Sequence, residues 1–140
     1  MSHPERSDPR RTIRVVAAVV ERDGRYLITQ RRPNAVLPLL WEFPGGKVEP
    51  GESDAAALRR EMQERLGIDV AVGDLISYVT HPYEHYTVDL FLYECRTEAG
   101  ELSCKNVHEF RWVTSVEFDR YPFTPADEAS MTKLLGVSDA

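Results

Sequence analysis

The clearest structural signal in this chain is the stretch GGKVEPGESDAAALRREMQERLGI, residues 45–68, which joins a glycine turn to a helix carrying clustered carboxylates. Ser53 can cap the start of that helix, and Gly67 can close its other end. The residues between them are good helix formers, and their apolar side chains recur every three and four residues. The stretch therefore predicts a helix over residues 53–66 that packs one side on a sheet. The expected apolar stripe is Ala55, Leu58, Met62 and Leu66.

Two glutamates on another face of the predicted helix suggest a cation site. Glu61 and Glu64 are three residues apart and therefore neighbours on the helix surface. Gly46 lies in the glycine turn, where a backbone carbonyl can approach closely. Magnesium and manganese prefer such hard oxygen ligands. The alternative is that these glutamates are solvated and paired with arginines of the same helix.

The rest of the chain predicts strands before and after this helix. Residues 12–21 and 25–30 alternate like strands and flank an Asp-Gly turn, which is a hairpin signature. A loop over residues 31–40 then leads to the short aromatic segment 41–46. Further strand patterns follow at residues 68–78, 86–96, 102–105 and 110–113, with a last helix over 126–135. This order predicts an α/β fold with a mixed sheet between helices.

Composition limits the class of protein. A chain of 140 residues that is 42% hydrophobic suits one globular domain over residues 12–140, preceded by a flexible polar arm over residues 1–11. The net charge of -6 argues against stable nucleic-acid binding or attraction to an anionic membrane. Residues 1–11 also lack the apolar stretch of a signal peptide, so we expect a cytoplasmic protein. Cys95 and Cys104 match no zinc or redox motif and are expected to be reduced.

The pattern GX5EX7REMXEXLGI over residues 46–68 resembles the Nudix box. The segment WEFPGG at residues 41–46, the strand end ITQR at 28–31 and the late YPFTPAD at 121–127 are similar to the MutT-type branch of that superfamily. The resemblance covers roughly residues 12–135. It implies an α/β/α sandwich with a mixed sheet and Mg²⁺- or Mn²⁺-dependent hydrolysis of nucleoside triphosphates to a monophosphate and pyrophosphate.

The same resemblance assigns the metal site. Glu61 and Glu64 would be metal ligands, or Glu61 would be the base that deprotonates water, and Gly46 would offer its carbonyl. Glu109 stands where a later loop often completes such sites. Its alternative is an ordinary acid on a surface loop.

The chain departs from the family pattern at Arg65, where the box has a second adjacent glutamate that is commonly a metal ligand. Glu52 and Arg60 are retained and would form a structural ion pair. Arg65 can turn outward, or it can pair with Glu61 and compete with metal. Three outcomes are open: an active enzyme with fewer protein ligands, an enzyme in which Arg65 touches substrate phosphate, or a nucleotide-binding domain that cleaves slowly.

Substrate contacts are also implied. Arg31 resembles the family's phosphate-contacting arginine, and its alternative is a surface residue at a strand end. Asp127 matches the position that reads the base edge, which would favour an amino-bearing base, with oxidised or modified dNTPs among the candidates. Asp127 also suits the first turn of the last helix. Phe43, Tyr86 and Phe123 could stack on a base, although each also suits core packing.

Two other functions remain open from the sequence. One is hydrolysis of another nucleoside diphosphate derivative, such as a nucleotide sugar, a dinucleotide or an RNA 5′ end. The other is a Nudix-fold nucleotide-binding module with weakened catalysis. The partner is in each case a nucleotide, and the sequence does not decide between a monomer and a homodimer, although the resemblance implies that such domains often pair. It assigns no role to the loop at residues 81–86.

Overall fold

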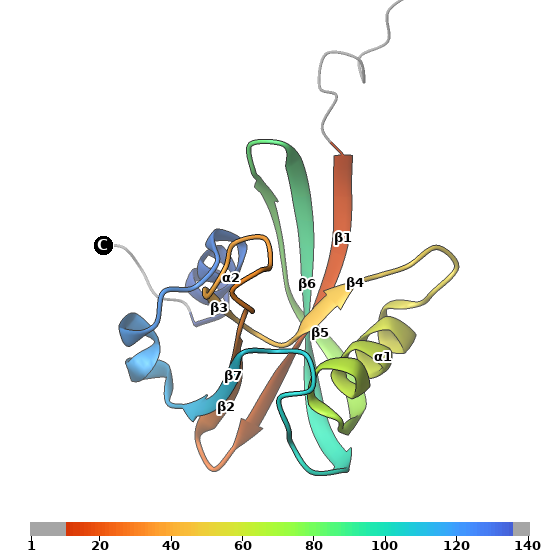
Figure 1. The fold of residues 1–140 in the computed structure, drawn as a ribbon, viewed down its shortest axis with the longest axis vertical. Coiled ribbons are helices and arrows are strands. Elements are labelled where there is room, and N and C mark those ends of the chain that lie inside the picture. Colours follow the sequence, from red (N-terminus) through yellow and green to blue (C-terminus); the bar gives the residue numbers. More distant parts are fainter. Residues whose placement is uncertain (1–10, 136–140) are drawn as a thin grey trace, which may run out of the picture.

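The structure is a computed structural model that describes residues 11–135. Most of the predicted arm and the last five residues of the predicted domain lie outside that range. Arg11, placed in the arm, already belongs to the first strand. The elements, shown in Figure 1, are β1 (Arg11–Arg22), β2 (Arg25–Gln30), β3 (Trp41–Glu42), β4 (Gly45–Lys47), α1 (Asp54–Leu66), β5 (Asp69–Pro82), β6 (Tyr86–Ala99), β7 (Glu109–Val113), the 3₁₀ helix η2 (Ser115–Arg120) and α2 (Pro125–Leu135).

Strand β1 organises the sheet. It pairs in parallel with β6 from Arg11 opposite Tyr86 to Val20 opposite Cys95, and it pairs antiparallel with β4. Strand β5 extends this part of the sheet by antiparallel pairing with β6. The far end of β1 turns into β2, which pairs with β3 and β7. The predicted mixed sheet is therefore confirmed.

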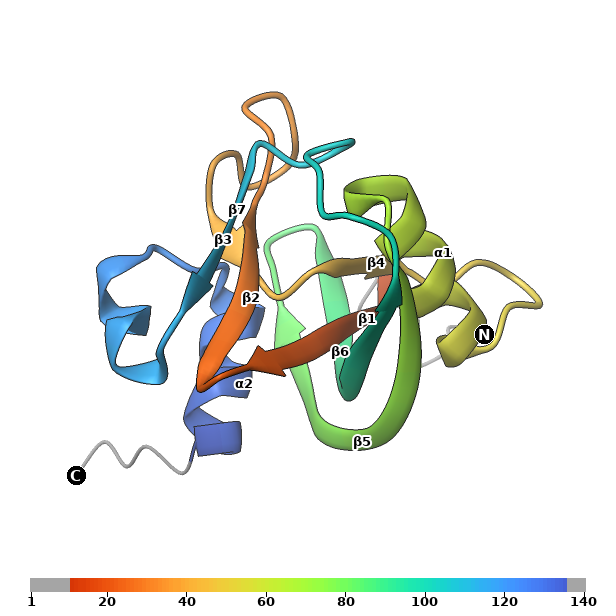
Figure 2. The ribbon, with the colours of Figure 1, turned by 90° about the horizontal axis from the view of Figure 1, so that it is seen from below.

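Helices cover the sheet from two sides, as Figures 1 and 2 show. Leu58, Met62 and Leu66 of α1 are fully buried in one apolar cluster with β1 and β5. A second cluster lies beneath η2 and α2 and contains Phe118 and Ala126. Burial of such side chains stabilises the fold by roughly 1.5–3 kcal/mol for each large apolar residue. The expected sandwich of helices around a sheet is confirmed.

Local signals placed the hairpin and the main helix correctly. Asp23 and Gly24 both have positive φ, 53° and 80°, as a tight turn between β1 and β2 requires. The Ser53 side chain accepts a hydrogen bond from the Ala56 N–H, and Gly67 ends α1 in the left-handed conformation. The apolar stripe differs at one position: Ala55 is only half-buried, and the fully buried alanine is Ala57.

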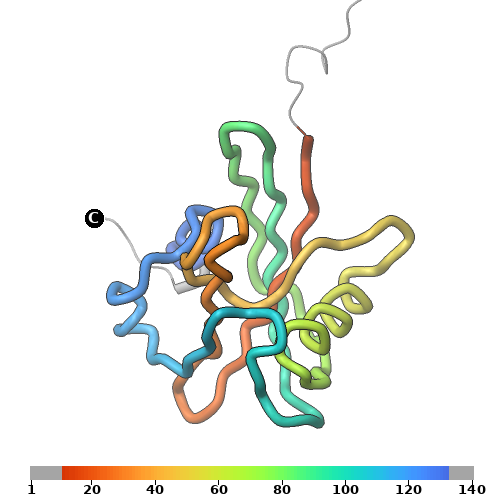
Figure 3. The backbone as a smooth tube through the Cα atoms, viewed as in Figure 1, coloured from red at the N-terminus to blue at the C-terminus, as the bar shows by residue number. Residues whose placement is uncertain are grey.

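The predicted strand at residues 102–105 is wrong. These residues form an irregular segment that runs alongside the end of α1, visible as the teal tube in Figure 3. The Ser103 N–H donates to the Leu66 carbonyl at 3.0 Å, and the Asn106 N–H donates to the Arg65 carbonyl at 3.0 Å. The segment thus satisfies carbonyls that the last turn of a helix leaves without partners.

The two cysteines, expected to be reduced and partly buried, differ in their exposure. Cys95 is buried, Cys104 is exposed, and both thiols are free. Burial raises the pKa of Cys95 to about 11, so this thiol is unreactive at neutral pH. Within residues 11–135, no helix has the length and apolar character needed to cross a membrane.

Candidate functional site

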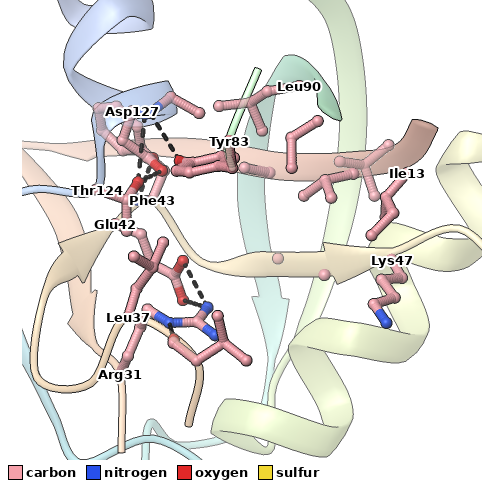
Figure 4. Close-up of a pocket in the computed structure, with 18 of the residues that line it drawn as sticks. Ile13, Arg31, Leu37, Glu42, Phe43, Lys47, Tyr83, Leu90, Thr124 and Asp127 are labelled. Carbon is pink, nitrogen blue, oxygen red and sulfur yellow. Dashed lines mark hydrogen bonds and ion pairs between the residues drawn. The ribbon is translucent and has the colours of Figure 1, made fainter. Parts of the chain in front are cut away.

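A cavity of about 350 Å³ lies over the middle of β1 and β4. Its walls come from β6, the loop at residues 31–40, β3 and the first turn of α2. Figure 4 shows Asp127 and Thr124 at one end and the Arg31–Glu42 pair below them, with Ile13 and Lys47 on the far side. Gly46 and Arg65 also line this cavity, so it extends from α2 to the predicted metal site.

Asp127 forms the inner wall at the α2 end. Its carboxylate accepts a hydrogen bond from the Phe43 backbone N–H at 3.0 Å and another from the Thr124 hydroxyl, and the residue is 5% exposed. Burial first, and then the nearby charge of Glu42, raise the pKa of Asp127 to about 7. Thr124 Oγ1 in turn accepts the Asp127 N–H at 3.3 Å. Asp127 therefore lies in the cavity wall, where a residue that reads a base edge would be needed, and also in the first turn of α2.

Main-chain bonds hold this end of the cavity together. The Trp41 N–H donates to the Pro122 carbonyl at 2.8 Å, and the Thr124 N–H donates to the Trp41 carbonyl at 3.0 Å. With the bond from Phe43 to Asp127, they fasten the start of α2 to β3 and the segment after it. The position of Asp127 is thus set mainly by backbone geometry.

Arg31 does line the cavity, but it has partners inside the protein. Its Nη1 lies 3.2 Å from Glu42 Oε1, and its Nε donates to the Val36 carbonyl at 2.5 Å. Burial raises the pKa of Glu42, while the charges of Arg31 and Arg65 oppose that shift. The sequence pattern predicts no role for Glu42. The available signal for a partly buried ion pair was the acidic residue between two aromatic residues in the segment WEF.

Of the three candidates for base stacking, Phe43 and Phe123 are buried and pack on each other, whereas Tyr86 stacks on Tyr83. The ring of Phe43 packs against Phe118 and Phe123 at centroid distances of 6.1 and 6.3 Å, and Phe43 is 2% exposed. Tyr83 and Tyr86 instead stack on each other in the cavity wall, with centroids 5.1 Å apart and planes inclined by 24°. The Tyr83 hydroxyl also accepts the Ala126 N–H at 3.1 Å. The loop left unassigned by the sequence therefore supplies an aromatic wall.

Glu52 and Arg60 join the loop before α1 to the helix. Arg60 Nε lies 2.7 Å from Glu52 Oε2, and Arg60 Nη2 lies 2.9 Å from Oε1, which makes the pair bidentate. Arg60 Nη2 also donates to the Lys47 carbonyl at 3.0 Å. The Arg60 hydrogen bonds, followed by the Glu49 N–H, lower the pKa of Glu52 to about 2. Charge-assisted bidentate pairs of this kind fix orientation strongly.

Glu61 is held between two guanidinium groups. Arg65 Nε lies 2.7 Å from Oε1, Arg60 Nη1 lies 3.1 Å from Oε2, and 9% of the Glu61 side chain is exposed. The carboxylate rests directly on Gly46, because a Cβ added there would meet the Glu61 carboxyl carbon at 2.2 Å. Arg65 has therefore taken the direction that competes with a metal ion for Glu61.

The other two predicted ligands are more exposed. Glu64 keeps 57% of its side chain exposed and lies 3.3 Å from Arg60, whereas Glu109 pairs with Arg111 at 2.9 Å. Across residues 11–135, no group of three or more His, Cys, Asp or Glu side chains is arranged to hold a metal ion. Glu61 nevertheless already binds two cationic groups beside a glycine that leaves it room. Hard carboxylate oxygens of this kind suit a divalent cation, and in this arrangement Arg65 occupies Oε1 of Glu61.

Comparison with known proteins agrees with this geometry. The family model described as "NUDIX domain" matches residues 15–133. The chain is 38% identical over 115 residues to CTP pyrophosphohydrolase of Escherichia coli (strain K12), covering 82% of this chain and 85% of that protein. It is 30% identical over 127 residues to 8-oxo-dGTP diphosphatase of Haemophilus influenzae, covering 90% and 93% of the two chains.

Solved structures show the same relationship. The solution structure of the E. coli ORF135 protein has a TM-score of 0.77 and 33% identity and covers 92% of both chains. The MutT NUDIX hydrolase from Burkholderia pseudomallei has a TM-score of 0.79 and 25% identity, covering 89% of this chain and 98% of that one. The chain belongs to the Nudix family. It is a MutT-like hydrolase in a family whose enzymes act on small nucleotides and generally use divalent metal ions.

Proposed function

We propose that this protein hydrolyses nucleoside triphosphates to the monophosphate and pyrophosphate with Mg²⁺ or Mn²⁺, and that it favours a base with an exocyclic amino group. One observation carries the proposal: a single cavity is lined by the buried carboxyl of Asp127 at one end and by Gly46 and Arg65 beside Glu61 at the other. A nucleotide in this cavity would have its base at α2 and its phosphates at α1.

The α2 end provides polar recognition beside an apolar wall. Burial and the nearby Glu42 raise the pKa of the Asp127 carboxyl, so this side chain takes up a proton more readily than an exposed aspartate does. Its ionised form can accept from an exocyclic amino group, and its protonated form can donate to a ring nitrogen or carbonyl. The stacked Tyr83 and Tyr86 offer a flat wall for a base, in keeping with the preference of aromatic side chains for offset stacking. Phe43 contributes its backbone N–H, which orients Asp127, more than its buried ring.

The α1 end would hold the reacting phosphates. Glu61, Glu64 and the carbonyl of Gly46 would hold the metal, with Glu109 as a further proposed ligand. When bound, the metal lowers the pKa of water and neutralises phosphate charge. Glu61 serves either as a ligand or as the base that takes the proton of the attacking water. Arg60 orients Glu61, and Glu52 fixes Arg60. Arg31 would contact the phosphate oxygens after sharing or leaving Glu42.

The decisive experiment measures pyrophosphate release from a panel of normal and oxidised dNTPs and NTPs with Mg²⁺ or Mn²⁺. We expect turnover of at least one triphosphate with an amino-bearing base. Glu61→Gln should abolish it, whereas the same change at the exposed Glu98 at the end of β6 should leave it unchanged. Turnover no higher than that of Glu61→Gln on every substrate would refute the proposal. Release of orthophosphate or a sugar phosphate would instead indicate another nucleoside diphosphate derivative as substrate.

A nucleotide-binding module with weak catalysis is the second candidate, because Arg65 Nε lies only 2.7 Å from Glu61 Oε1. This function predicts nucleotide binding by calorimetry that a chelator does not weaken, without turnover. A gain of activity in Arg65→Glu would then identify the substitution that silenced the site.

Partners and location follow the same reasoning. The net charge of -6 favours a small nucleotide over stable nucleic-acid binding. A cytoplasmic location and a monomeric or homodimeric state stay predictions, which fractionation and sedimentation of the full chain would test.

A further inference from the structure

A second cleft, of about 420 Å³, adjoins the first cavity. It lies between the loop at residues 31–40, the end of α1 and the segment before β7. We call it the basic cleft, and its lining residues are Arg31, Arg32, Asn34, Ala35, Arg65 and Asn106. Arg31 and Arg65 line both hollows, so an extended ligand could pass from one to the other.

The lining of the basic cleft is positive and contains no carboxylate. Arg31 is paired with Glu42, and Arg65 is paired with Glu61, both of which lie outside the lining. Arg32 has a neutral partner, since its Nη1 donates to the Asn106 side-chain oxygen at 3.1 Å. A concentration of positive charge in a hollow of an acidic protein attracts anions, because low-dielectric walls focus the field.

The frame of the basic cleft is fixed by the irregular segment described above. The Asn106 N–H donates to the Arg65 carbonyl, and the Asn106 side chain accepts from Arg32. The His108 N–H donates to the Gln30 carbonyl at 2.9 Å, next to Arg31 in the chain. The three arginines therefore extend from elements that are tied together, and guanidinium groups held in this way suit the oxygens of a phosphate chain.

We propose that the basic cleft binds the distal phosphates of a polyphosphate chain and that Arg65 exchanges Glu61 for a phosphate oxygen when the chain arrives. The assignment of that chain to a nucleotide rests on the proposed function. Arg65 is the only one of the three arginines that contacts Glu61 within the described part of the chain. Its exchange would couple arrival of the phosphates to release of a Glu61 oxygen.

The test is calorimetric binding of inorganic tripolyphosphate to the full chain in EDTA, without any nucleotide. We expect the wild type to bind and Arg32→Gln and Arg65→Gln each to weaken binding by at least tenfold. Arg59→Gln provides the matched control, because Arg59 is an exposed arginine on the same helix and is absent from the lining. Arg32→Lys, which retains the charge, should recover part of the affinity. Thermal melting of each variant checks that the fold is preserved.

The outcomes separate this proposal from the proposed function. The proposal that the basic cleft binds phosphates would be refuted if the wild type did not bind tripolyphosphate. It would also be refuted if Arg59→Gln lost as much affinity for tripolyphosphate as Arg32→Gln and Arg65→Gln. Binding that depends on Arg32 and Arg65, in a protein that hydrolyses no triphosphate, would support the cleft and refute the proposed function. A nucleoside monophosphate in a parallel titration should bind without a difference between the wild type and Arg32→Gln, because it lacks distal phosphates.

Discussion

Replacing Gly46 with alanine should slow the enzyme strongly while leaving it folded. The new Cβ would lie 2.2 Å from the Glu61 carboxyl carbon and 2.4 Å from each carboxylate oxygen, whereas real Cβ contacts essentially never fall below 3.0 Å. The obstacle is the end of a side chain, so Glu61 can retreat by about 0.8 Å without moving the backbone. That retreat disturbs the contacts at 2.7 Å to Arg65 and 3.1 Å to Arg60.

A displacement of that size at a catalytic group costs about 100-fold in kcat/KM, or about 2.7 kcal/mol of transition-state stabilisation. The assay is pyrophosphate release at substrate concentrations below KM, with thermal melting alongside. Gly45→Ala is the matched comparison: its Cβ would lie 1.9 Å from the Val16 carbonyl oxygen, so the pairing of β1 with β4 must open. We expect that variant to lose more than about 2 kcal/mol of stability. A Gly46→Ala enzyme with kcat/KM within threefold of the wild type would show that Glu61 is not positioned for catalysis.

Three further perturbations test the charges of the site. The pKa of Glu52 is lowered to about 2, so its ion pair with Arg60 stabilises the fold above the unfolded-state pKa of about 4.5, and this stabilisation is lost as the pH falls through 2. In urea denaturation, the wild type should therefore have a higher free energy of unfolding than Glu52→Gln above pH 4.5, and this difference should disappear as the pH falls to about 2. The pKa of Asp127 is raised to about 7, so the pH dependence is opposite: the wild type should lose stability relative to Asp127→Asn as the pH rises from about 4 to 7. A difference in the free energy of unfolding that stays constant over this range would contradict the buried position of Asp127. Arg65→Glu should tighten Mn²⁺ binding at least tenfold in calorimetry without nucleotide, because a unit charge about 5 Å from a dication is worth roughly 6 to 7 kcal/mol at an effective dielectric of 20; unchanged affinity would place Arg65 away from the cation.

The parts of the fold that were predictable depend on short-range chemistry. Ser53 and Gly67 mark the two ends of α1, and both were predictable because helix capping and left-handed backbone depend on the local sequence. The Asp23-Gly24 turn was predictable for the same reason, since its positive φ angles are also a local requirement. The segment at residues 102–105 alternates like a strand, yet the N–H groups of Ser103 and of the nearby Asn106 donate to carbonyls at the end of α1. Those carbonyls are distant in sequence, so no local pattern could reveal the competition.

In the site too, local features were predictable from the sequence, whereas contacts between distant segments were not. The motif spacing predicts that Glu52, Arg60 and Glu61 lie on or beside one helix, and in the structure Arg60 contacts both glutamates. It could not reveal that Glu42 meets Arg31, because that contact depends on how β2 and β3 pair. The contact of Tyr83 with α2 could not be predicted for a similar reason: the tip of the β5–β6 hairpin meets the start of α2 only in the folded chain.

The backbone bonds between Trp41, Pro122 and Thr124 bear on how this protein could be redesigned. These bonds use main-chain atoms, so they do not require particular side chains at Trp41 or Thr124. The side chains of Thr124 and Asp127 are the exception, because they bond each other and the Phe43 N–H at the start of α2. Libraries that keep Thr124, Asp127 and Tyr83, and that vary residue 86, would test base preference with the least risk to folding, which makes this end of the cavity the place to begin engineering new nucleotide selectivity.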